Sequence, residues 1–229
     1  MNREVIIACD FQNKETTFEF LEKLKDEKPY LKIGMELYYR EGAGLVRELK
    51  AKGFKIFLDL KLHDIPNTVY KAMKNIASLG VDITNVHAGG GIEMMRMAKK
   101  GLDEGAVGNK PLLIAVTQLT STSAEVLKNE LLIEKSLEQT VKIYAENAKK
   151  AGLDGVVCSP LEAPIIKALG LISVTPGIRL AGDSANDQKR ISTPALAKEL
   201  GSNFIVVGRS ITAAENPLEA YRKCVAEFC

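Results

Sequence analysis

Asp59 and Lys61 are the residues whose spacing suggests chemistry most directly, within the segment Asp59-Leu-Lys61-Leu-His63-Asp64. Residues two apart in a β-strand point to the same face of the sheet, so these two side chains lie together if the segment is extended. On an interior face they must pair, because an isolated buried charge is prohibitively expensive. The alternative interpretation is a solvated cluster of charges at the end of a strand.

Two Gly–Arg pairs follow apolar runs later in the chain, at Gly177-Ile-Arg179 and Gly208-Arg209. Backbone N–H groups and guanidinium groups together can hold a phosphate, which favours an anion site here. The simpler alternative is turn glycines with surface arginines. The polar stretch 179–190 between the pairs is long for a connection in a compact fold, and it predicts either a lid over the site or a disordered excursion.

Other polar residues contribute less to the interpretation. His63 and His87 receive no catalytic role, since either can simply hydrogen-bond within a core. The glycines that follow His87 fit a tight turn better than an anion nest. We expect no metal site, because Lys32 and Lys61 share the same ring of strand ends and would repel a cation.

The elements that position these residues follow a repeated pattern, in which an amphipathic helical segment ends at a glycine and a β-rich run begins a few residues later. The glycine fits that place because the residue after a helix often adopts a left-handed conformation. The pattern occurs at Gly53, Gly80, Gly152, Gly170 and Gly201. Before Gly152, apolar residues recur at steps of three and four, which predicts one helical stripe of Leu137, Val141, Tyr144, Ala148 and Ala151.

Eight apolar, β-branched runs are typical of parallel strands buried on both faces. They lie at about 4–9, 30–34, 55–60, 82–87, 112–117, 155–158, 171–175 and 204–208. Eight such units in 229 residues predict a closed (β/α)8 TIM barrel, in which chemistry lies where strands end and the following loops begin. The runner-up, an open doubly wound sheet, usually has a glycine-rich turn after its first strand, whereas this chain has Asp10-Phe-Gln-Asn there.

Composition limits the possible classes of protein. Hydrophobic residues make up 46% and charged residues 26%, which is typical of a soluble globular chain, and we expect one catalytic domain over residues 1–229. The net charge of +2 does not favour nucleic-acid binding. The apolar run at the start is too short for a signal peptide, and no window is long enough to span a membrane, so we expect a cytoplasmic protein. The four cysteines form no CxxC pair and suggest neither a disulfide framework nor a zinc site.

Taken together, these residues closely resemble the orotidine 5′-monophosphate decarboxylase family along the whole chain. The resemblance rests on Asp10, Lys32 within LKIG, DLKLHDIPNT at 59–68, TQLTS at 117–121, TPGIR at 175–179, Gln188 and VGRS at 207–210. It implies a homodimeric enzyme that converts orotidine 5′-monophosphate to UMP and CO2 without a cofactor, in the last step of de novo pyrimidine biosynthesis.

The resemblance also implies roles for individual residues. Lys61 would donate a proton to C6 of the pyrimidine, within a charge network of Lys32, Asp59, Lys61 and the partner subunit's Asp64. The substrate-binding residues would be Asp10 and Lys32 at the ribose, Thr68 of the partner subunit at another ribose hydroxyl, Ile65, Thr120 at the pyrimidine edge, Arg179, Arg209 and the Gly208 amide at the phosphate, and Gln188 between phosphate and base.

Two other functions fit parts of the pattern. A Mg²⁺-dependent sugar-phosphate decarboxylase or aldolase on a related barrel shares D-x-K-x-x-D, but that group carries a metal-binding carboxylate on strand two, where this chain has Lys32. A non-catalytic nucleotide-binding barrel is the other possibility, against which the intact Asp59, Lys61 and Asp64 argue. Asp64 itself could merely cap the helix that Pro66 begins within its own chain.

Overall fold

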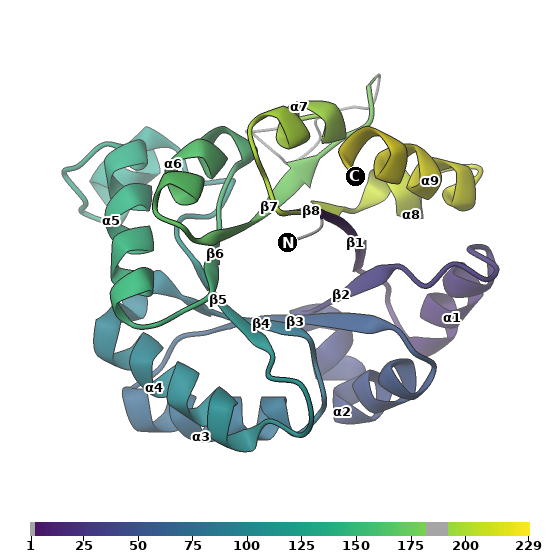
Figure 1. Cartoon of the computed structure of the whole chain (residues 1–229), viewed down its shortest axis with the longest axis horizontal. Helices are drawn as coiled ribbons and strands as arrows, with labels where there is room; N and C mark the ends of the chain where they lie inside the picture. Colours follow the sequence, from purple (N-terminus) through teal and green to yellow (C-terminus); the bar gives the residue numbers. More distant parts are fainter. Residues whose placement is uncertain (1–2, 182–191) are drawn as a thin grey trace.

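Eight parallel strands alternate with helices in the computed structural model, which describes residues 3–181 and 192–229. The strands are β1 (Glu4–Cys9), β2 (Tyr30–Gly34), β3 (Lys55–Leu62), β4 (Ile83–His87), β5 (Leu112–Val116), β6 (Gly155–Val157), β7 (Ile172–Ile178) and β8 (Phe204–Val207). Each pairs with the next in sequence, and β8 pairs with β1, so the sheet closes on itself. The predicted (β/α)8 barrel is therefore confirmed (Figure 1).

The helices form an outer ring around these strands, as Figure 1 shows. They are α1 (Lys14–Glu22), α2 (Met35–Ala51, kinked at Gly42), α3 (Pro66–Ala77), α4 (Gly91–Gly105), α5 (Leu137–Lys150), α6 (Ala163–Ala168), α7 (Pro194–Glu199), α8 (Arg209–Thr212) and α9 (Pro217–Phe228). Short single turns lie at Ala88–Gly90, Val126–Glu130 and Pro160–Glu162. Among the described residues, no helix has the length and apolar character needed to cross a membrane.

The five glycines predicted to end helices all have positive φ, between 72° and 87°. A left-handed residue at this place lets the chain leave the helix and turn back into the next strand. Of the stripe expected on α5, Val141, Ala148 and the following Ala151 are buried, whereas Leu137 and Tyr144 are only half-buried. The repeated junction thus sets the spacing of the βα units.

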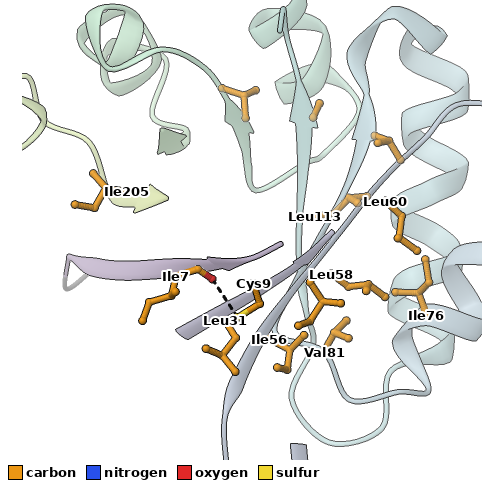
Figure 2. Close-up of a cluster of buried hydrophobic side chains, with 14 of the residues drawn as sticks. Ile7, Cys9, Leu31, Ile56, Leu58, Leu60, Ile76, Val81, Leu113 and Ile205 are labelled. Carbon is orange, nitrogen blue, oxygen red and sulfur yellow. Dashed lines mark hydrogen bonds between the residues drawn. The ribbon is translucent and has the colours of Figure 1, made fainter. Parts of the chain in front are cut away.

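The strands are buried on both faces, as their continuous apolar composition predicted. Ile6 and Phe57 lie in the cluster inside the barrel, whereas their neighbours Ile7 and Leu58 lie in the cluster between strands and helices. Figure 2 shows side chains of this outer cluster, including Ile7 and Leu58, on strands beside the helices. Two packed layers therefore hold the strand ends in fixed positions around the mouth of the barrel.

Two strands run further than predicted, and both extensions contain an irregularity. β3 continues to Leu62 with a register shift between Leu58 and Leu62, and β7 continues to Ile178 with a shift after Thr175. The predicted ends at 60 and 175 were therefore too early. A bulge lets a strand continue while it re-aims its side chains, and bulges are common beside active sites.

Candidate active site

Two cavities lie at the carboxyl ends of the strands, where a barrel of this kind carries its chemistry. One, of about 380 Å³, is lined by Lys32, Phe57, Asp59, Lys61, Val116, Gln118, Leu119, Thr120, Ser121, Val157, Val174, Pro176 and Val206. The other, of about 400 Å³, is lined by Ala8, Asp10, Lys32, Pro176, Gly177, Arg179, Val206, Gly208, Arg209 and Thr212. Because Lys32, Pro176 and Val206 line both, the cavities adjoin and form one elongated site.

Charged side chains from three neighbouring strands form a row of alternating sign along this site. Lys32 Nζ lies 2.9 Å from Asp10 Oδ1 and 3.5 Å from Asp59 Oδ2. Lys61 Nζ lies 2.7 Å from Asp59 Oδ1, which confirms that Asp59 and Lys61 pair on one face. Asp59 is 7% exposed as a residue, so the solvated cluster considered from the sequence does not describe this pair.

Opposite charges keep the central members of this row ionised. Burial disfavours the charge of Asp59, but Lys32 and Lys61 outweigh burial and lower the pKa of the Asp59 carboxyl below its usual value. Burial likewise disfavours a charged Lys32, yet the carboxylates of Asp59 and Asp10 raise the pKa of the Lys32 ammonium. The cavity floor therefore holds a fixed cation–anion array at neutral pH.

Two arginines, Arg179 and Arg209, contribute positive charge to the lining of the second cavity. Arg179 follows β7 and is 8% exposed, and its Nη1 donates to the Ile178 carbonyl at 2.9 Å. Arg209 begins α8 directly after Gly208, which is the N-cap of that helix. Both arginines and both glycines of the two Gly–Arg pairs line the same cavity. The two Gly–Arg pairs thus meet at the ends of β7 and β8, with Arg179 buried and Arg209 exposed at the cavity.

Asn85 also belongs to this site, although the sequence pattern predicted no role for it. Its Oδ1 accepts the backbone N–H of Lys61 at 2.8 Å, and its Nδ2 donates to Asp59 Oδ1 at 2.7 Å. Its one sequence signal is a carboxamide in the middle of the apolar strand Ile83–His87. That signal does not say which strand the side chain contacts.

Three of the residues expected to contact substrate lie away from both cavities within this chain. Asp64, Ile65 and Thr68 are exposed, and Asp64 Oδ1 accepts the N–H of Ile65 at 2.6 Å. The N-cap of α3 is Ile65, without a side-chain capping bond, so Asp64 is not the helix cap considered from the sequence. Pro66 does begin α3, as predicted. Gln188 and the segment 182–191 of the predicted lid lie outside the described residues.

The histidines and the glycine-rich turn lie beside the site. His63 and His87, with ring centroids 6.0 Å apart, line a third cavity of about 290 Å³, which shares Gln118 and Leu119 with the first. Burial, and then the charges of His63 and Lys61, lower the pKa of His87 below its usual value. The glycines after His87 form one 3₁₀ turn, Ala88–Gly90, in line with the tight turn that was predicted.

A (β/α)8 barrel with a Lys/Asp array beside a two-arginine cavity is typical of a barrel enzyme that acts on phosphorylated substrates. The family model described as "Orotidine 5′-phosphate decarboxylase / HUMPS family" matches residues 3–224, and the chain belongs to this family.

Known proteins are similar over nearly the whole chain. Orotidine 5′-phosphate decarboxylases of Bacillus cereus (strain Q1) and Bacillus anthracis (strain CDC 684 / NRRL 3495) are each 56% identical over 227 residues, covering 97% of this chain and 95% of theirs. The crystal structure of orotidine 5′-phosphate decarboxylase from Lactobacillus acidophilus is 45% identical, with a TM-score of 0.90 over 99% of both chains. An uncharacterised conserved protein from Geobacillus kaustophilus is also 45% identical, with a TM-score of 0.88 over 98% of this chain and 100% of that chain.

Proposed function

We propose that this enzyme decarboxylates orotidine 5′-monophosphate to UMP and CO2, with Lys61 as the proton donor to C6. The observation that carries the proposal is the elongated site, in which the Lys/Asp row adjoins a cavity holding Arg179 and Arg209. A nucleoside monophosphate has the matching shape, with its base at the charged row and its phosphate at the arginines. Thr120 lines the base end, and Asp10 and Lys32 lie where the ribose would pass.

The chemistry assigned to Lys61 follows from its charge and position. When the bond from C6 to the carboxylate breaks, CO2 leaves and the electron pair stays on C6. An ammonium already fixed beside C6 stabilises this developing charge without reorganisation, because Asp59 holds Lys61 Nζ at 2.7 Å. Lys61 then transfers a proton to C6, giving UMP, and the neutral amine regains a proton from solvent.

We also propose a homodimer that completes the site with the partner subunit's Asp64 and the partner subunit's Thr68. In this chain Asp64, in the β3–α3 connection, and Thr68, in the first turn of α3, are exposed. Ile65, next to Asp64 in the chain, is 67% exposed, so an apolar side chain also faces solvent here. A two-fold interface places the same patch on both subunits, so each β3–α3 connection would approach the other subunit's mouth. Ile65 would then contact substrate across that interface.

The decisive assay mixes the protein with orotidine 5′-monophosphate and follows the loss of ultraviolet absorbance, with and without EDTA. We expect turnover that EDTA does not change, because β2 presents Lys32 where a metal-dependent relative would need a carboxylate. Loss of turnover in EDTA, with recovery on adding Mg²⁺, would favour the metal-dependent alternative. Unchanged absorbance with retained UMP binding would favour a non-catalytic nucleotide-binding barrel.

Arg209→Ala should weaken the apparent affinity for substrate and slow turnover, because phosphate binding helps to assemble the closed site. Loss of one charge-assisted contact should cost about 1.5–3 kcal/mol in kcat/KM. Arg222→Ala is the matched control, since Arg222 lies on α9 and pairs with Glu27 on the surface. A substrate that lacks its phosphate should be nearly insensitive to Arg209→Ala. An equal loss with both substrates would remove Arg209 from the phosphate site.

A further inference from the structure

Asn85 is completely buried in β4 and hydrogen-bonds both Asp59 and Lys61 of the charged row. Its carboxamide accepts from the Lys61 backbone and donates to the Asp59 carboxylate, while Lys61 Nζ donates to the same Asp59 oxygen. The three residues therefore form a closed ring of hydrogen bonds. A backbone N–H can only donate and a carboxylate can only accept, so the residue between them needs one acceptor and one donor. An asparagine supplies both at the required reach.

The backbone beside Asn85 is irregular. Leu58 pairs with Thr84 and Leu62 pairs with Val86, so residues 59–61 of β3 occupy the space opposite the single residue Asn85. Lys61 has a φ of 53°, a left-handed conformation that costs free energy for a residue with a Cβ. The Asn85 side chain accepts the Lys61 N–H within this irregular stretch, so that this backbone donor is satisfied. The bulge is thus closed by a side chain.

We propose that Asn85 is a positioning residue for the decarboxylation, which holds the Lys61 backbone in this conformation and fixes the Asp59 carboxylate so that Lys61 Nζ points into the cavity. Asn85 is not among the described residues that line either cavity, so it acts through Lys61 and Asp59. This inference rests on the proposed function, since it assigns Asn85 to the same site. Nothing else on β4 makes both contacts among the described residues.

Three variants test the proposal. Asn85→Ala removes both contacts, whereas Asn85→Asp keeps an acceptor for Lys61 N–H but faces Asp59 with a second carboxyl group. Thr84→Val is the matched control, because Thr84 is equally buried on the same strand and its Oγ1 bonds the Leu58 carbonyl at 3.0 Å, away from Asp59 and Lys61. Each variant is assayed for kcat, KM and UMP affinity, and exchange of the Lys61 amide hydrogen is followed by NMR.

For Asn85→Ala we expect kcat to fall about thirtyfold or more, UMP affinity to stay within about threefold, and the Lys61 amide to lose protection. Asn85→Asp should keep that protection but lose turnover at neutral pH. Its activity relative to the unmodified enzyme should recover as the pH falls, because a protonated carboxyl can donate to Asp59 as the amide does. Thr84→Val should change kcat less than about threefold.

The readouts separate failure of this inference from failure of the proposed function. If the unmodified enzyme does not convert orotidine 5′-monophosphate, the proposed function fails, and the Lys61 amide still reports whether Asn85 holds the bulge. If Asn85→Ala does not fold, the pH-dependent recovery of Asn85→Asp decides. A kcat within about threefold of the unmodified enzyme in a folded Asn85→Ala, or a loss in Asn85→Asp that is the same at every pH, would overturn the proposal.

Discussion

Lys61→Ala should abolish most turnover of orotidine 5′-monophosphate while leaving the affinity for UMP within about tenfold. The ammonium matters most when negative charge develops at C6, and this charge is absent from the bound product. The variant loses the proton donor as well as the stabilising cation, so kcat should fall far more than KM rises. Steady-state kinetics and calorimetric UMP titration measure the two effects separately.

A second lysine on the same strand provides the control for this variant. Lys55 lies at the opposite end of β3 and pairs with Glu4 at 2.7 Å, outside both cavities. Lys55→Ala should therefore leave kcat nearly unchanged, since exposed ion pairs contribute about 1 kcal/mol of stability or less. If Lys61→Ala reduced kcat by less than about tenfold, Lys61 would not be the central group.

Mixing two inactive variants should restore activity if Asp64 acts across the dimer interface. Asp64→Ala and Lys61→Ala homodimers are unfolded together and refolded so that heterodimers form. One site of each heterodimer then receives both defects and the other receives none, so activity should return to about half of the unmodified value per heterodimer. The exposed position of Asp64, away from both cavities of its own chain, is the physical reason for this expectation.

The outcome has a clear opposite and a matched control. If Asp64 acts within its own chain, each site of the heterodimer keeps one defect and activity stays absent. That result would contradict the proposal that the two subunits share each site. Asp59→Ala mixed with Lys61→Ala is the control, because these residues contact each other at 2.7 Å within one chain. That mixture should stay inactive whatever the position of Asp64.

Local sequence determined most of the architecture. The helix-ending glycines define the βα units because a left-handed residue follows each helix, and all five have positive φ. The two-residue spacing of Asp59 and Lys61 predicted their pairing, although the register shift in β3 and the left-handed Lys61 interrupt regular alternation there. Two Gly–Arg pairs after consecutive strands must lie at one end of a parallel barrel. These properties depend on neighbours in the chain, so they can be read from spacing.

Only the tertiary structure decided which distant groups meet. The pairing of Lys32 with both Asp10 and Asp59 depends on the register of three strands, and the role of Asn85 depends on a bulge in a different strand. β3 runs two residues beyond its predicted end at residue 60, because apolar content does not reveal that a strand continues through an irregularity. For Asp64 the described residues of one chain show no partner group in either cavity, because the side chain is exposed to solvent. Spacing fixes the face to which a side chain points, whereas closure of the barrel fixes what that side chain contacts.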